Sequence, residues 1–229
     1  MLIPLQTTLV LSPSIRMKTL LFLLFLTALL PAQKPPAARK PAAAADGWLL
    51  TFADEFDARE LDLSKWIPHD PGAKTPTPET VSLSDGLLHI PGTISTFGLF
   101  AQMYGRFEMR FRGATGSELI LQPVPSGILP RIEIFRMTAA DAVALGNWWG
   151  SEQTERSYSD TFGVSGLSRG FHTVVLEWTR ERIAWSIDGK KTFESGDGVP
   201  HQPMYLVIRG VPDVDYVRVY QSPRPQGSQ

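Results

Sequence analysis

Residues 104–112, Tyr-Gly-Arg-Phe-Glu-Met-Arg-Phe-Arg, alternate strictly between apolar and charged side chains from Arg106 onward. Successive side chains of a strand point to opposite faces. Phe107, Met109 and Phe111 therefore share one face, and the charged residues share the other. This period of two predicts a strand with one buried face and one solvated face, as in an antiparallel sheet.

Strand patterns recur along the chain. The further strands that we expect are Leu87–Ile90, Phe171–Trp178, Arg182–Ile187, Lys191–Phe193, Met204–Arg209 and Val214–Tyr220. Asp188-Gly189 is typical of a hairpin turn. The chain has 19 Gly and 19 Pro, which favours many short strands, and no segment keeps a helical period. We therefore predict an all-β sandwich or jelly roll.

The N-terminus has the pattern of a targeting segment. Lys18 precedes the apolar run Leu20–Leu30, which is shorter than the ~20 residues that span a bilayer. The run matches the apolar region of a secretory signal peptide. We expect residues 1–32 to form that peptide, with Met17 as an alternative start. An uncleaved anchor is the competing interpretation.

Composition divides the remainder of the chain. Residues 33–46 are rich in Pro and Ala, which predicts a linker. We expect one domain over residues 47–221 and a disordered tail over 222–229. The chain has no cysteine, so a secreted or periplasmic product of this size has to rely on its core rather than on disulfides.

Charge excludes some classes of partner. The chain has 22 basic and 23 acidic residues, for a net charge of −1. This balance gives no reason to expect binding to nucleic acid or, after signal cleavage, to a membrane. The four histidines, His69, His89, His172 and His201, are scattered and predict no metal site. We expect a monomer without a cofactor.

Several segments share a pattern with one known family. They are, in order, Thr51–Asp57 with Leu61–Trp66, Tyr104–Glu108, Phe171–Trp178 with Ile183–Lys190, and Val214–Tyr220. Together they resemble the family 16 glycoside hydrolases, the laminarinase and lichenase group. The resemblance implies a concanavalin A-like jelly roll of two antiparallel sheets, with a cleft for a polysaccharide or oligosaccharide across one of them. Some relatives hold a structural calcium ion through backbone oxygens.

Most of the matching residues have structural roles in this interpretation. We expect Trp66, Trp178 and Trp185 in the core, because large aromatic residues dominate the cores of sandwiches. His172 is expected to be a hydrogen-bonded structural histidine rather than a base.

The segment Arg131–Arg136, Arg-Ile-Glu-Ile-Phe-Arg, departs from the family at its catalytic strand. The family pattern there is Glu-hydrophobic-Asp-hydrophobic-hydrophobic-Glu, with the nucleophile first and the acid/base last. A local bulge brings the third side chain onto the face of the first two. Here Arg131 and Arg136 occupy the catalytic positions and Glu133 the middle one. Arginine can neither attack as a nucleophile nor act as general acid and base.

Alternatives remain for this strand. Glu133 and Glu118 are weak candidates for displaced acids, since retaining hydrolysis needs two carboxyl groups about 5–5.5 Å apart. A structural alternative is a salt-bridged group of Arg131, Glu133 and Arg136. In that group the arginines would favour the ionised form of Glu133.

Trp148 and Trp149 follow the altered strand within Asn147–Gly150. This segment resembles the part of the family that lines the cleft. Adjacent strand residues point to opposite faces, so one Trp should enter the core and the other could contact a sugar. The predicted carbohydrate-binding residues are Arg131, Glu133, Arg136, Trp148 and Trp149.

Three functions compete. The first is a secreted, catalytically degenerate domain that binds a polysaccharide such as a β-glucan. The second is an active glycosidase or transglycosylase with displaced acids. The third is a structural or interaction domain that has lost sugar recognition.

Overall fold

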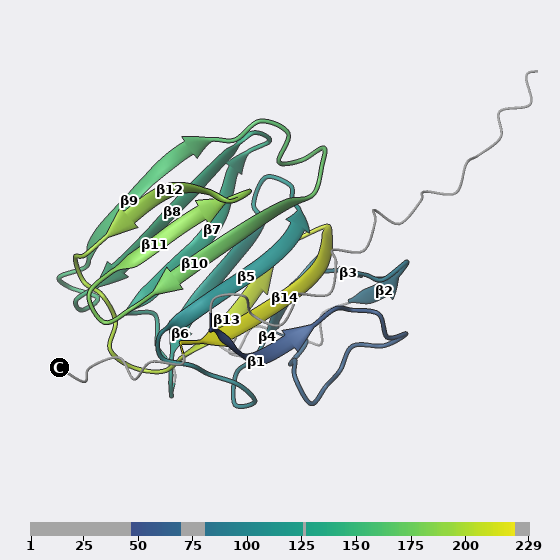
Figure 1. The fold of residues 1–229 in the computed structure, drawn as a ribbon, viewed down its shortest axis with the longest axis horizontal. Helices are drawn as coiled ribbons and strands as arrows, with labels where there is room; N and C mark the ends of the chain where they lie inside the picture. Colours follow the sequence, from purple (N-terminus) through teal and green to yellow (C-terminus); the bar gives the residue numbers. More distant parts are fainter. Residues whose placement is uncertain (1–46, 70–80, 126, 223–229) are drawn as a thin grey trace, which may run out of the picture. The chain divides into compact units, whose positions relative to one another are not determined.

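The computed structural model describes residues 47–69, 81–125 and 127–222. Within these ranges every regular element is a strand (Figure 1). The strands are β1 (Leu49–Asp54), β2 (Ser82–Ser84), β3 (Leu87–His89), β4 (Thr93–Ser95), β5 (Gly105–Arg112), β6 (Glu118–Pro123), β7 (Arg131–Ala139), β8 (Ala142–Trp149), β9 (Arg156–Gly163), β10 (His172–Trp178), β11 (Ile183–Ile187), β12 (Lys190–Ser195), β13 (Met204–Arg209) and β14 (Asp213–Gln221).

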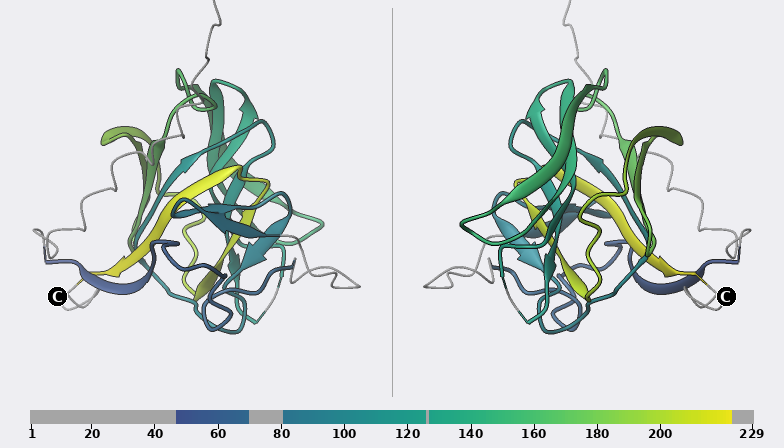
Figure 2. Two further views of the ribbon diagram at one scale, coloured as in Figure 1. Left: turned by 90° about the vertical axis from the view of Figure 1, so that its right-hand side faces the viewer. Right: turned by 90° about the vertical axis from the view of Figure 1, so that its left-hand side faces the viewer.

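The strands form two sheets. Sheet A has the order β12-β11-β10-β5-β14-β3-β2, and β1 also pairs with β14. Sheet B has the order β4-β13-β6-β7-β8-β9. All pairings between these strands are antiparallel. Figure 2 shows the two layers from the side. The predicted all-β sandwich is confirmed.

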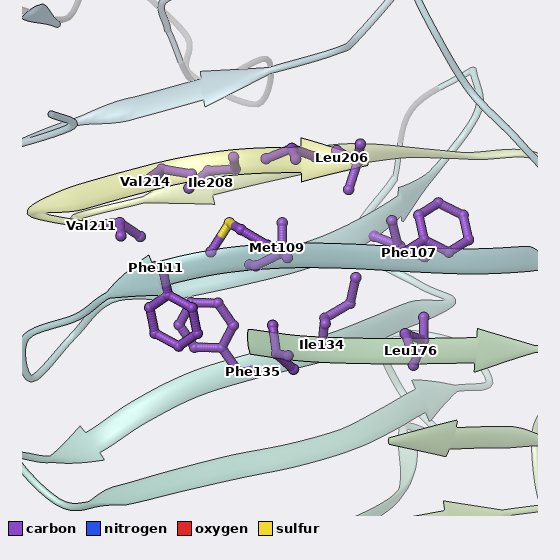
Figure 3. Packing of buried hydrophobic residues seen from close by; sticks show 14 of the residues in the cluster. Phe107, Met109, Phe111, Ile134, Phe135, Leu176, Leu206, Ile208, Val211 and Val214 are labelled. Carbon is purple, nitrogen blue, oxygen red and sulfur yellow. The ribbon is translucent and has the colours of Figure 1, made fainter. Parts of the chain in front are cut away.

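The core lies between the two sheets. Phe107, Met109 and Phe111 of β5 are buried as the alternation predicts. Figure 3 shows Phe111 next to Phe135 of β7, and the two rings stack with centroids 4.2 Å apart. Each fully buried apolar side chain of this size contributes about 1.5–3 kcal/mol to folding. The strand begins at Gly105 rather than Tyr104, because Tyr104 has a positive φ of 63°.

The three tryptophans expected in the core are fully buried there. Each indole also donates a hydrogen bond: Trp66 to Asp54 Oδ2 at 2.9 Å, Trp178 to the Pro200 carbonyl at 3.1 Å, and Trp185 to the Glu133 carbonyl at 3.0 Å. A buried indole N–H usually finds such a partner.

The predicted β11–β12 turn is also present. Asp188 and Gly189 both have positive φ, 50° and 77°, which a type I′ hairpin turn requires. The Asp188 carboxylate lies 2.7 Å from His172 Nδ1 and accepts from the backbone N–H of Thr173. His172 is therefore a hydrogen-bonded residue at the turn, as expected.

Some predictions fall outside the described residues. These are the signal peptide (1–32), the linker (33–46) and all of the tail but Ser222. The described residues contain no helix long and apolar enough to cross a membrane. They also contain no group of three or more His, Asp or Glu residues that could hold a metal ion.

Candidate carbohydrate-binding face

A bulge on β7 places three side chains of the altered strand on one side of sheet B. The three steps from Glu133 to Arg136 lie opposite two steps on β8, which is the signature of a bulge. Ile134 and Phe135 both enter the core, as Figure 3 shows. Arg136 therefore returns to the face that carries Arg131 and Glu133.

A side chain of sheet A contacts the β7 bulge from the core side. Trp185 of β11 reaches across the core and donates to the Glu133 carbonyl. A buried carbonyl at a break in the ladder needs a partner of this kind. The core thus fixes the backbone of the strand that the sequence resemblance matches to the family's catalytic strand.

We call the side of sheet B that points away from the core the outer face of sheet B. Directly opposite residues of antiparallel strands share a face, so the strand registers define its members. Its members include Arg131, Glu133 and Arg136 of β7, Glu118, Ile120 and Gln122 of β6, Tyr205, Val207 and Arg209 of β13, and Trp148 of β8, beside small residues of β4, β8 and β9.

Two ion pairs cross this face. Arg136 Nε donates to Glu133 Oε1, and Arg209 donates to Glu118 Oε2 at 2.9 Å. In the described part of the chain, Arg131 forms no ion pair within 4.0 Å. The predicted three-residue salt bridge is therefore reduced to the pair Arg136–Glu133.

Glu133 is the most deeply buried charged group on this face, with 1% of its surface exposed. Burial raises the pKa of Glu133, the charge of Glu118 raises it further, and Arg136 offsets only part of the shift. The expectation that flanking arginines favour the ionised form is wrong in its net direction, because desolvation outweighs the ion pair.

Two buried polar atoms beside one another on β7 lack partners. Glu133 Oε2 and Arg131 Nε have no hydrogen-bond partner among the described residues. Most buried polar atoms are hydrogen-bonded to protein or to ordered water. Both atoms are therefore unsatisfied within the described residues, although little of either is exposed.

The register separates the two tryptophans. Trp148 lies opposite Arg131 on the outer face, and the Arg131 guanidinium lies over its ring at 4.4 Å from the centroid. Trp149 points to the other side, where it packs against Gly198 so closely that a Cβ there would lie 1.9 Å from its ring. The expectation that one of them enters the core is wrong, because both are only partly buried. Trp149 supports the 197–198 turn, and only Trp148 shares a face with Arg131 and Arg136.

Sequence reasoning missed the contribution of β13 to this face. Tyr205, Val207 and Ile120 form a small buried apolar cluster with Phe97. Tyr205 also donates to Gln122 Oε1 at 3.0 Å. Met204–Arg209 was predicted as a strand, and the period of two of any strand puts Tyr205, Val207 and Arg209 on one side.

A separate hollow of about 550 Å³ lies between the edge strands β9 and β12. Its charged residues include Lys191 and Asp188, which contact Glu194 and His172 respectively. No buried polar atom without a partner lines this hollow in the described part of the chain. The outer face of sheet B is therefore the better candidate site.

Sequence comparison finds proteins named as glycanases and as Crh-like proteins. The chain is 28% identical over 132 residues to the endo-1,3-1,4-β-glycanase ExsH of Rhizobium meliloti, 54% of this chain and 28% of that protein. It is 26% identical over 189 residues to the endo-1,3-1,4-β-glycanase EglC of the same organism, 78% of this chain and 35% of that protein. Over 114 residues it is 32% identical to Crh-like protein 4 of Aspergillus fumigatus, 46% of this chain and 25% of that protein. The matches thus span only about a quarter to a third of these relatives. No family profile matches the chain.

Solved structures share the fold over most of the chain. The laminarinase catalytic domain of Thermotoga maritima superposes with a TM-score of 0.65 at 19% identity, covering 77% of this chain and 99% of that domain. The laminarinase of Rhodothermus marinus superposes with a TM-score of 0.65 at 23% identity, covering 76% of this chain and 97% of that chain. SCLam, a non-specific endo-β-1,3(4)-glucanase of glycoside hydrolase family 16, gives a TM-score of 0.66 at 20% identity, covering 80% of this chain and 94% of that chain. The predicted concanavalin A-like jelly roll is confirmed.

Glycanase relatives in sequence and laminarinases in fold together support a family 16 glycoside hydrolase-like chain.

Proposed function

We propose that this chain is a secreted or periplasmic polysaccharide-binding domain that does not hydrolyse its ligand. The observation that carries the proposal is the β7 bulge. It presents Arg131, Glu133 and Arg136 on one face in the pattern of the family's catalytic strand, with arginine at both catalytic positions. A retaining glycosidase needs two carboxyl groups there, and guanidinium groups cannot replace them.

An aromatic ring and several polar groups on the same face support the proposed binding of a polysaccharide. Trp148 is half-buried rather than sealed in the core. Glu133 Oε2 and Arg131 Nε lack partners, and Gln122 lies on the adjacent strand. Aromatic rings next to a few fixed polar groups are the usual composition of a small-molecule site.

Binding and cleavage are tested together on insoluble and soluble polysaccharides. Laminarin, lichenan, a galactan and their acidic derivatives are presented to the full chain, and both retention and release of reducing ends are measured. We expect retention by at least one polymer without release of reducing ends. Trp148→Ala should weaken retention about tenfold or more, since it removes the ring on which the Arg131 guanidinium lies, a contact that contributes on the order of 1 kcal/mol or more. Tyr158→Ala, an exposed aromatic on the opposite side of sheet B, is the matched control.

An active enzyme is the second candidate, because Glu133 has the raised pKa of a general acid and Glu118 shares its face. It predicts release of reducing ends that Glu133→Gln abolishes. That result would overturn the non-catalytic proposal. Absence of both binding and turnover across the panel would instead leave the structural or interaction domain.

The location and the oligomeric state are proposals on separate grounds. The apolar run Leu20–Leu30 supports export, which N-terminal sequencing of the extracellular or periplasmic product would test. We propose a monomer, and its mass in solution by light scattering would test this.

A further inference from the structure

Arginines stack on aromatic rings in both sheets, but their counter-ions differ. Arg110 lies over the Phe171 ring at 4.7 Å and is ion-paired with Asp215. Arg112 lies over the same ring at 5.6 Å and is paired with Asp213.

Arg218 of β14 follows the same rule. It lies over the Tyr216 ring at 3.8 Å and donates two hydrogen bonds of 2.7 Å to the Glu55 carboxylate. Among the stacked arginines of the described residues, Arg131 alone has an aromatic ring and no carboxylate within ion-pairing distance. Its Nε is also buried without a partner.

The charge count on the outer face of sheet B agrees with this difference. The face carries Arg131, Arg136 and Arg209 against Glu118 and Glu133. The two carboxylates pair with Arg209 and Arg136. Three cations and two anions leave one positive charge uncompensated, and geometry assigns it to Arg131.

The Arg131–Trp148 stack also limits how a neutral sugar could bind. A guanidinium 4.4 Å from the centroid covers one face of the indole ring. A sugar ring would need that same aromatic surface for stacking. Trp148 acts instead as a support that holds the guanidinium flat, which leaves its outer N–H groups in a fixed fork.

We propose that the outer face of sheet B binds an acidic polysaccharide, with a carboxylate or sulfate group of the polymer completing Arg131. This inference rests on the proposed function and names its ligand class. A planar guanidinium matches carboxylate and sulfate oxygens with two parallel hydrogen bonds. The net charge of −1 means that the whole protein does not attract a polyanion, so selectivity has to arise at the site. In this arrangement Arg131 contacts the ligand and Trp148 is a positioning residue.

The test uses one polymer backbone in three forms: a β-1,3-glucan that is neutral, carboxymethylated or sulfated. Binding of the full chain to each is measured by affinity electrophoresis and titration calorimetry over a range of salt concentrations. We expect the acidic forms to bind at least tenfold more tightly than the neutral form. We expect Arg131→Gln to remove that preference, by about tenfold or more, as for loss of a hydrogen bond to a charged group.

Matched variants separate a specific site from general charge. Arg112→Gln removes one stacked, ion-paired arginine from sheet A and should leave binding unchanged. Arg131→Lys keeps the positive charge but lacks the two parallel N–H donors of a guanidinium, so it should lose most of the preference for the acidic glucans. Trp148→Phe should retain more binding than Trp148→Ala, and thermal unfolding of each variant confirms that it is folded.

Each outcome has a defined meaning. Equal binding of the neutral and acidic glucans overturns this inference and leaves the proposed function standing. Equal weakening by Arg112→Gln and Arg131→Gln also overturns it, because attraction would then be non-specific. If none of the three forms nor any polymer of the wider panel binds, the proposed function fails and the inference fails with it. Preference for the carboxymethylated or the sulfated form identifies the anionic group.

Discussion

The outer faces of both sheets carry arginines and carboxylates, but these charged groups are more completely paired on sheet A than on sheet B. On sheet A, Arg106, Arg110, Arg112 and Arg218 all pair with carboxylates. The Tyr216 hydroxyl also donates to Glu108 at 2.7 Å. On sheet B, Glu133 and Arg131 each keep a buried polar atom without a partner.

This difference distinguishes framework from site. A partly buried charge network stabilises a fold only when its members satisfy one another. The charged groups of sheet A meet that condition. On β7 of sheet B, two buried polar atoms have no hydrogen-bond partner among the described residues. Unpaired groups on an otherwise well-paired sandwich are what a binding partner would complete.

The largest expected effect comes from breaking a pair on sheet A. Arg110→Gln leaves Asp215, whose side chain is 6% exposed, without its cation. Removing one member of a buried pair costs about 3 kcal/mol or more. Urea unfolding should show a loss of this size, and Arg110→Met combined with Asp215→Leu should recover part of it. A loss below about 1 kcal/mol would mean that the sheet A network is not structural.

An intermediate, pH-dependent effect is expected at Glu133. Because its folded pKa is raised, the folded state holds the proton more tightly than the unfolded state does. The associated stabilisation is present below the unfolded value and is lost as pH rises through the folded pKa. Relative to Glu133→Gln, the wild type should therefore lose stability as pH rises above the ordinary titration range of a Glu carboxyl.

Urea unfolding of both proteins across pH 4–8 measures this difference. Glu152→Gln, at an exposed carboxylate, controls for general effects of pH. If the wild type instead loses stability relative to Glu133→Gln as pH falls, the sign is the opposite of that expected, and the Arg136 ion pair outweighs burial.

The smallest expected effect is on stability at Arg131. Arg131→Gln removes a cation–π contact with no ion pair behind it, which costs only about 0.5–1 kcal/mol. The contrast with Arg110→Gln in the same unfolding assay is the sharpest form of the comparison. If the two variants lose equal stability, Arg131 stabilises the fold as much as Arg110 does. The two outer faces would then not differ in the structural role of their arginines.

Segments whose sequence shows a strand alternation or a turn signal could be predicted from that local pattern alone. The alternation from Phe107 to Phe111 identified the buried face of β5, and Asp188-Gly189 identified a turn that needs two positive φ angles. Strand β9 was not predicted, because its side chains are almost all exposed and show no apolar alternation. The short strands β2 and β4 have only three residues each, too few for a period to be visible.

For the candidate site, the family pattern led to the grouping of the β7 side chains but not to the arrangement around them. The bulge that aligns Arg131, Glu133 and Arg136 follows from the resemblance. The positions of Trp148 and Trp149 depend on the register between β7 and β8, which the sequence leaves open. The net pKa shift of Glu133 depends on burial by residues distant in sequence, and so the local count of arginines gave the wrong direction.

The hydrogen bond from Trp185 to the Glu133 carbonyl separates the shape of β7 from its chemistry. The backbone is held from the inside, so the side chains on the outside can be exchanged without moving it. A domain built this way can lose a reaction and keep its scaffold, which is also why its fold alone is a poor guide to its activity.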